Sequence, residues 1–235
     1  MTRRFALYFC PSAGSELYRF GAWWLGRDCR SVDTATPPDC GLVAEDWRRI
    51  TQSPRHYGFH ATLKPPFALA DGTTRAGLVE ALVAFASERR AFQAPPLQLV
   101  QHEGFLALMP TQDSLVLTAF ADACVVDLDR FRRPASPAEI QRRRAAGLTQ
   151  RQDELLARWG YPYVQDEFRF HMTLTERLSE SQYRQVHPLL AIRAKAVAGV
   201  PLEVADLCLF EQADGDAPFV LTQRFPLVAS APTKI

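Results

Sequence analysis

The sequence predicts an α+β fold made by duplication, a bilobal arrangement in which two antiparallel sheets with flanking helices surround a central cleft. The first observation behind this prediction is a tetrapeptide, His-x-Thr-Leu, that occurs at 60–63 and again at 171–174. The second is that each copy is followed by the same order of elements, a helix and then strands. We therefore expect residues 1–235 to form a single domain of two lobes, with motif strands near 57–64 and 168–175.

In the first half, we expect strands where apolar residues cluster between turn residues and helices where they recur at helical spacing. The expected strands are Phe5–Cys10, Tyr57–Leu63, Leu97–Val100, Gly104–Met109 and Ser114–Thr118. The expected helices are Ser15–Leu25, Ala44–Gln52 and Thr73–Ala91. Pro65 and Pro66 should end the motif strand, because proline has no N–H to give to a sheet.

In the second half, helix starts are marked by capping boxes, in which a Ser or Thr precedes a Glu or Gln by three residues. The expected helices are Ala119–Phe131, one opening at Ser136-Pro137-Ala138-Glu139, one from Thr149 to Gly160, and Ser179–Val197. The expected strands are Phe168–Thr175, Leu202–Glu211 and Pro218–Leu227, the last two forming a hairpin around Asp214-Gly215-Asp216.

Side-chain alternation along a strand gives each motif two unlike faces. His60 and Thr62 share one face, while Phe59, Ala61 and Leu63 take the other. The second copy repeats this pattern, with His171 and Thr173 together and Phe170, Met172 and Leu174 opposite. Two such strands at one cleft would supply two imidazoles and two hydroxyls.

This combination suits acid–base chemistry on a phosphate ester. The pKa of histidine lies near neutrality, so one ring can accept a proton while the other donates one. Threonine hydroxyls can donate to phosphate oxygens. We expect His60 and His171 to be catalytic, and Thr62 and Thr173 to bind the phosphate.

Three further residues are candidates for substrate binding. Lys64 lies four residues after His60, and Arg169 lies two before His171, so each would share the histidine face of its strand. Both cations suit phosphate, Arg as a bidentate donor and Lys as a point charge. Tyr8 lies on the less apolar face of the first strand and could line the cleft, although a partly buried sheet tyrosine would have the same pattern.

Composition limits the other possibilities. There are 27 Lys and Arg against 26 Asp and Glu, a balance that argues against a protein built to hold long nucleic acid. The five cysteines show no metal-ligand spacing, the histidines form no zinc motif, and no Gly-rich phosphate loop is present. No apolar stretch has the length of a membrane span or a signal-peptide core. We expect a cytoplasmic protein without metal or cofactor, and no membrane partner.

At these motifs the chain resembles the two-histidine phosphoesterase superfamily. Within that superfamily, residues 55–67, with 8–11 and 170–175, resemble an uncharacterised bacterial family associated with phosphonate-utilisation operons. The resemblance implies a bilobal fold and metal-independent attack on phosphodiesters by the two histidines. The operon association implies a small cyclic phosphate ester of a ribose derivative as substrate.

Two other functions remain open. One is a 2′,3′-cyclic phosphodiesterase acting on RNA ends or nucleotides, which would be favoured if the basic segment Arg132–Arg144 lined the cleft. The other is a non-catalytic sugar-phosphate-binding accessory protein. The pair of histidines argues against it, because a binder needs no acid–base couple.

Overall fold

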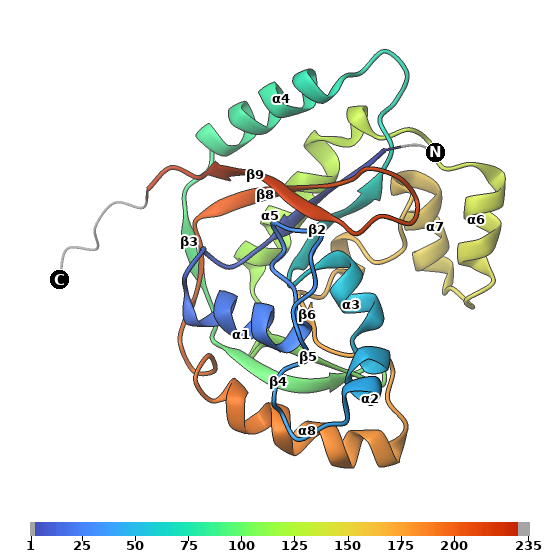
Figure 1. Cartoon of the computed structure of the whole chain (residues 1–235). Helices are drawn as coiled ribbons and strands as arrows, with labels where there is room; N and C mark the ends of the chain where they lie inside the picture. The colour runs from blue at the N-terminus through green and yellow to red at the C-terminus, as the bar shows by residue number, and fades with distance from the viewer. Residues whose placement is uncertain (1–2, 230–235) are drawn as a thin grey trace.

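The computed structural model describes residues 3–229 and has the predicted α+β class, with a large antiparallel sheet, a small second sheet and flanking helices (Figure 1). The large sheet has the order β4-β5-β6-β2-β1-β8-β9. Its strands are β1 (Arg4–Phe9), β2 (Ala61–Phe67), β4 (Leu97–His102), β5 (Phe105–Pro110), β6 (Met172–Thr173), β8 (Asp206–Gln212) and β9 (Val220–Pro226). The small sheet pairs β3 (Phe92–Ala94) with β7 (Leu202–Val204).

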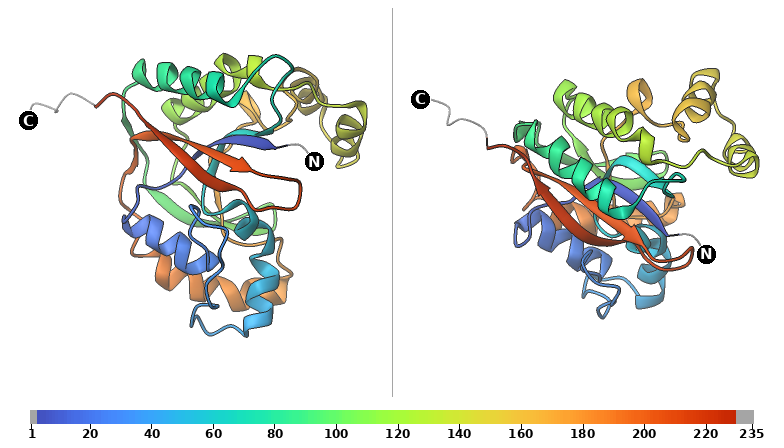
Figure 2. Two further views of the ribbon diagram at one scale, coloured as in Figure 1. Left: turned by 45° about the horizontal axis from the view of Figure 1, so that its top comes forward. Right: turned by 90° about the horizontal axis from the view of Figure 1, so that it is seen from above.

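Eight α-helices and two 3₁₀ turns are found in this part of the chain. They are α1 (Glu16–Leu25), α2 (Ala44–Ile50), α3 (Gln52–Tyr57), α4 (Arg75–Ser87), α5 (Leu115–Asp127), η1 (Asp129–Phe131), α6 (Pro137–Arg144), α7 (Gln150–Trp159), η2 (Gln165–Glu167) and α8 (Glu180–Ala194). Helix α4 lies at one end of the molecule and α8 at the other, while α6 and α7 form an arm that stands out from the body (Figures 1 and 2). None of these helices is long and apolar enough to cross a lipid bilayer.

The two halves of the chain exchange strands. β4 and β5, which follow the first motif, form a sheet half with β6 of the second motif. β8 and β9, which follow the second motif, join β1 and β2 instead. The halves meet where Ala61 of β2 pairs with Met172 of β6. The order of elements that the two halves share in the sequence therefore produces two half-sheets, each of which contains strands from both halves of the chain.

The helix caps follow the sequence closely. Ser136, Thr149 and Ser179 each close a capping box at the start of α6, α7 and α8. Gly160 ends α7 in the left-handed conformation, with φ of 72°. The expected hairpin at the C-terminal end is present as β8 and β9.

Other expectations were wrong in detail. Ser114–Thr118 is not a strand, because Ser114 caps α5 through a hydrogen bond from the Leu117 N–H. The helix expected at Ala44–Gln52 ends at Ile50 and is followed by α3, which has Pro54 in its first turn, where a missing N–H costs nothing. The first motif strand begins at Ala61 and continues past Pro65 and Pro66. It can do so because its pairing with β1 is interrupted there by two register shifts.

Candidate active site

The buried side chain of Arg27 holds in place the segment that leads into the first motif. Helix α3 ends at Gly58, whose φ of 78° suits glycine. The Arg27 guanidinium donates to the carbonyl oxygens of Arg55 and His56 at 2.6 and 3.0 Å, so the last turn of α3 is capped from outside. A Cβ at Gly58 would lie 3.0 Å from the Cβ of Cys29, which leaves no space for a larger residue. The turn before His60 is therefore set by packing as well as by hydrogen bonds.

The His60 ring is held by three contacts. Its Nδ1 lies 2.8 Å from the Gly58 carbonyl oxygen. Since a carbonyl can only accept, Nδ1 carries the proton and Nε2 has the free lone pair. Nε2 lies 3.3 Å from Oγ1 of Thr62, whose hydroxyl is then the donor. The ring also stacks on Tyr8, with centroids 3.8 Å apart and planes 24° apart.

These surroundings keep His60 neutral at pH 7. Burial, with smaller contributions from the charges of His171 and Arg27, lowers the pKa of His60 to about 4, although the hydrogen bond to Gly58 opposes this shift.

His171 repeats the hydrogen bond of His60. Its Nδ1 donates to the Arg169 carbonyl oxygen, also two residues earlier, at 2.7 Å. Its ring has other neighbours, with His102 at 5.7 Å and Phe105 at 5.8 Å between ring centroids. Burial lowers the pKa of His171, the charge of His102 adds to this, and the carboxylate of Glu103 opposes it.

The sheet register brings the two motifs side by side. Ala61 and Met172 pair directly and are fully buried, and the half-buried His and Thr side chains lie on the other face. Continued by one residue in each direction, this antiparallel register sets Thr62 opposite His171 and His60 opposite Thr173. The two histidines are then diagonal neighbours, a pair whose Cβ atoms usually lie somewhat less than about 7–8 Å apart.

A cavity of about 420 Å³ opens beside this pair of strands, under the arm. Thr62, Arg169 and His171 line it. His60 and Thr173 are not among the residues that line it. The other lining residues are Leu63, Pro65, His102, Glu103, Phe105, Gln152, Tyr161, Tyr163, Val164, Glu167 and Phe168.

Lys64 does not lie beside His60 in this cavity, which corrects the expectation from the sequence. Its side chain is buried, and its Nζ donates to the Val125 carbonyl oxygen at 2.9 Å and pairs with Asp129 at 3.3 Å. Between Thr62 and Lys64, β2 has one residue more than the facing stretch of β1. Such a bulge breaks the alternation of faces and turns the lysine toward α5.

Tyr8 is also corrected, because it supports His60 and does not line the cavity. The ring is 1% exposed and lies in a buried cluster with Phe210 and Phe219. Burial raises the pKa of Tyr8, so its hydroxyl stays protonated at neutral pH.

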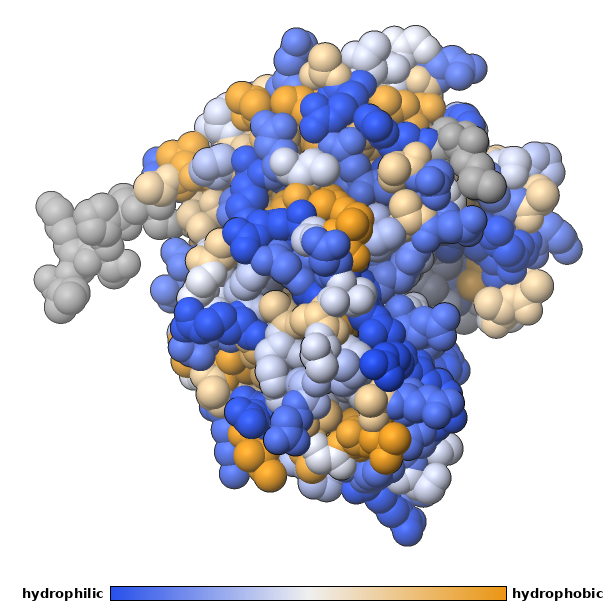
Figure 3. All heavy atoms as spheres, viewed as in Figure 1, coloured by the Kyte–Doolittle hydropathy of each residue, from blue (hydrophilic) through white to orange (hydrophobic). Residues whose placement is uncertain are grey.

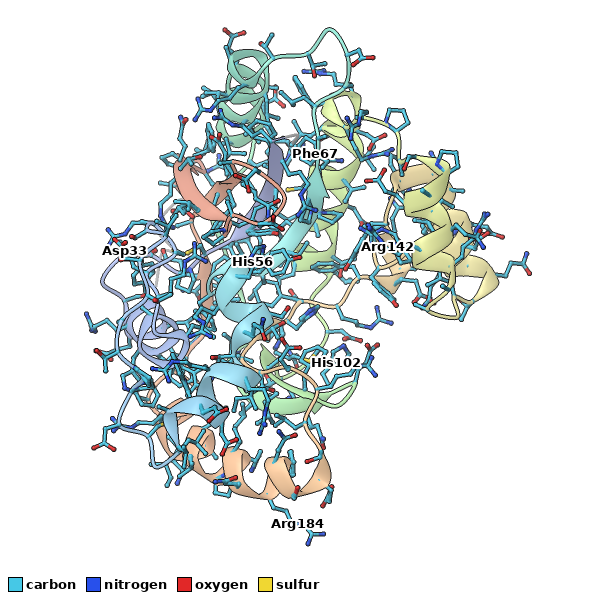
Figure 4. All side chains as sticks on the ribbon, turned by 45° about the vertical axis from the view of Figure 1, so that its right-hand side comes forward. Asp33, His56, Phe67, His102, Arg142 and Arg184 are labelled. Atoms are coloured by element: carbon cyan, nitrogen blue, oxygen red, sulfur yellow. The ribbon has the colours of Figure 1, made fainter. Side chains whose placement is uncertain are left out.

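Several residues of the cavity were missed from the sequence. His102 and Glu103 lie at the β4–β5 turn. Tyr161, Tyr163 and Glu167 lie in the segment that follows α7 in the sequence. Figure 4 shows His102 on the side of the body from which the arm stands out. His102 looked isolated because nothing in the sequence says that β5 pairs with the second motif strand. The signal available was a histidine between the expected strands Leu97–Val100 and Gly104–Met109.

The basic segment Arg132–Arg144 does not line the cavity beside the histidines, so the condition that favoured an RNA-end substrate is not met. Among residues 3–229, no group of three or more His, Cys, Asp and Glu side chains is arranged to hold a metal ion.

A protein-family model described as "Protein of unknown function (DUF1045)" matches residues 62–220. The chain belongs to the DUF1045 family. Two curated proteins are similar to it, both called ribose 1,5-bisphosphate phosphokinase PhnN. That of Janthinobacterium sp. (strain Marseille) is 36% identical over 95% of this chain and 50% of its own length. That of Laribacter hongkongensis (strain HLHK9) is 33% identical over 99% of this chain and 54% of its own length. This DUF1045 chain thus spans about half the length of the curated relatives it matches.

Among solved structures, the DUF1045 chain is similar to E. coli LigT. LigT complexed with 3′-AMP has a TM-score of 0.44 and 14% identity, and the match covers 97% of this chain and 99% of that one. LigT complexed with NADP⁺ has a TM-score of 0.46 and 11% identity, with the same coverage.

Proposed function

We propose that this protein is a metal-independent phosphodiesterase of the two-histidine type that acts on a small cyclic phosphate ester, a ribose derivative of phosphonate metabolism. The observation that carries the proposal is the matched pair of histidines. Each ring is fixed through Nδ1 to the carbonyl two residues earlier, and the alternation of side chains along the two paired strands supports a common face for both rings. Two adjacent structural histidines would have no need of this common orientation.

The surroundings of the rings support different roles for them. His60 has the larger apolar contact and a pKa of about 4, so it is the ring that stays neutral and accepts a proton. His171 is near Glu103, which favours its protonated form, and a bound phosphate anion favours it further. We assign His60 as the general base and His171 as the general acid.

The reaction then follows from these positions. With the phosphate bound, the Thr62 hydroxyl turns from Nε2 of His60 to a phosphate oxygen. A water molecule gives a proton to this Nε2 while its oxygen forms a bond to phosphorus. The bond from phosphorus to the leaving oxygen breaks, and Nε2 of His171 gives that oxygen its proton. Thr173 and Arg169 stabilise the charge on the other phosphate oxygens.

The test is a substrate screen with purified protein. Ribose cyclic phosphates, nucleoside cyclic phosphates and RNA ending in a cyclic phosphate are offered, and phosphomonoester formation is followed. We expect the ribose cyclic phosphates to have the highest kcat/KM, and turnover to persist in a chelator. Activity that a chelator abolishes and zinc or manganese restores would contradict the proposed chemistry. Preference for RNA would support the alternative cyclic phosphodiesterase.

A further inference from the structure

Two buried cysteines lie side by side near the turn that precedes the first motif. Cys10 directly follows β1, and Cys29 lies in the segment 26–43 between α1 and α2. Their Sγ atoms are 3.4 Å apart, and both thiols are free. The sulfur atoms of a disulfide are about 2.05 Å apart, so a small approach of the two side chains would allow the bond to form. The pair is therefore a candidate site for reversible oxidation.

The surroundings of the two thiols give them different reactivity. The hydrogen bond from Cys10 lowers the pKa of Cys29, although burial opposes this shift. The same hydrogen bond, together with burial, raises the pKa of Cys10. Arg224 donates to Sγ of Cys10 at 3.4 Å, and its charge favours the thiolate form of both residues. Because the thiolate is the nucleophile, Cys29 is the residue that reacts first with an oxidant.

Cys29 lies close to solvent, although its side chain is only 3% exposed. Along the chain it stands between Asp28, which is half-buried, and Arg30, which is exposed, and the Tyr18 hydroxyl covers its Sγ at 3.6 Å. The segment 26–43 contains no helix or strand and crosses the near face in Figure 1, where Figure 3 shows side chains of mixed hydropathy. Irregular surface segments open locally at a low cost in free energy, so a molecule as small as hydrogen peroxide can reach Cys29.

Each cysteine is next to one of the residues that hold His60. Cys10 lies two residues after Tyr8 and belongs to the same buried cluster. Cys29 packs against Gly58, where an added Cβ would lie 3.0 Å from the Cβ of the cysteine. Tyr8 stacks on the His60 ring, and the Gly58 carbonyl accepts its Nδ1 proton. Shortening the distance between the Sγ atoms from 3.4 Å to about 2.05 Å therefore acts on both supports of the ring.

We propose that a peroxide oxidises Cys10 and Cys29 to a reversible disulfide, and that this bond displaces the His60 ring. The Cys29 thiolate attacks one oxygen of hydrogen peroxide, the O–O bond breaks, and the hydroxide that leaves takes up a proton to become water. The thiol of Cys10 then attacks the sulfenic sulfur of Cys29, the S–O bond breaks, and the hydroxyl group leaves with the Cys10 proton as a second water. Two electrons thus pass from the thiol pair to one peroxide. The disulfide does not depend on the proposed function, whereas its effect on turnover rests on it.

Disulfide mapping tests the bond itself. Purified protein is treated with hydrogen peroxide, alkylated and digested, and linked peptides are identified by mass spectrometry. We expect a bond between Cys10 and Cys29, the loss of two of the five thiols, and recovery of both with dithiothreitol. Cys10→Ala should abolish the bond, while the matched control Cys40→Ala, at a half-buried thiol, should leave it intact. Oxidation of Cys40 with the pair still reduced, or a bond from Cys29 to Cys208, would overturn the proposal.

NMR of the histidine rings tests the effect of the disulfide on the site. We expect the His60 ring signals to shift on oxidation and to return on reduction, while those of His187 on α8 stay in place. With a confirmed substrate, oxidation should lower kcat/KM at least about tenfold, because a displacement of about 1 Å at a reacting group can cost roughly 10²-fold in rate. The Cys10→Ala protein should keep its activity in peroxide.

The two readouts separate this inference from the proposed function. A mapped disulfide with unchanged His60 signals would overturn the coupling between the thiol pair and the ring. If the His60 signals shift on oxidation but no ester is hydrolysed by the reduced protein, the phosphodiesterase assignment fails and the thiol pair stands.

Discussion

His60 and His171 have the same hydrogen bond at Nδ1 and differ in what surrounds their rings. His60 is stacked on a buried tyrosine and leads into the seven-residue strand β2. His171 leads into the two-residue strand β6 and has a second histidine and a glutamate beside it. The comparison shows that the repeated tetrapeptide places two equal side chains in unlike surroundings, and the proposed roles of His60 as base and His171 as acid depend on that difference.

The largest effect is expected from removing either histidine. His60→Ala and His171→Ala should each lower kcat/KM by roughly 10²–10⁴, the usual range for a lost acid or base. The double variant should fall far short of the product of the two losses, because the groups act as a unit. His187→Ala on α8 is the matched control and should keep full activity. Folded His60→Ala and His171→Ala proteins with full activity on a confirmed substrate would show that the motif is structural.

The two histidines should also control different limbs of the pH–rate profile. The low-pH limb of kcat/KM should report the base and the high-pH limb the acid. Glu103→Gln removes a carboxylate that raises the pKa of His171, so it should move the high-pH limb to lower pH and leave the low-pH limb in place. A pH–rate profile of the variant tests this, and movement of the low-pH limb alone would reverse our assignment of base and acid.

Lys64 should affect stability and not catalysis, although it follows the first motif directly. Lys64→Ala removes a buried cation from Asp129 and leaves a cavity, which should cost about 2–4 kcal/mol in the free energy of unfolding. Urea unfolding measures this, and the kcat/KM of the remaining folded protein should be unchanged. A selective loss of substrate binding would show that Lys64 contributes to the active site.

The hydroxyls should have smaller effects than the rings. Thr62→Ala removes one neutral hydrogen bond to phosphate and should lower kcat/KM by roughly 3- to 10-fold, with Thr173→Ala similar. Both side chains are half-buried beside the cavity, so the urea midpoints should barely change. Thr51→Ala, at a buried hydroxyl outside the site, should do the opposite and lower stability with activity intact.

The last prediction concerns the pH dependence of stability. The pKa of His60 is depressed to about 4 in the folded protein, and about 6.5 is normal for the unfolded chain. Between these values the unfolded chain binds more protons, so the free energy of unfolding should decrease as the pH falls from about 6.5 to about 4. His60→Gln should flatten this part of the curve, and equal slopes in both proteins would mean that His60 is not desolvated.

The sequence allowed the motif faces to be predicted, because alternation along a strand depends only on the backbone and on the apolar pattern of residues such as Phe59 and Met172. It also allowed the helix caps at Ser136 and Thr149 to be predicted, since these are local. Lys64 was misplaced because a bulge depends on the pairing with β1, which is not local. His102 and Tyr161 were missed for the same reason, since they reach the site through distant strand pairing and through the arm.

The exchange of strands between the halves has a consequence for how the chain folds. The partner of β1 on its second side is β8, so the register of Arg4 with Gln212 requires segments about as far apart as the chain allows. β5 likewise cannot complete its pairing until β6, much later in the sequence, is present. Folding rates fall as contacting residues become more distant in sequence. We therefore expect slow folding without an autonomous half, and synthesis through the second motif strand before the two histidines can meet.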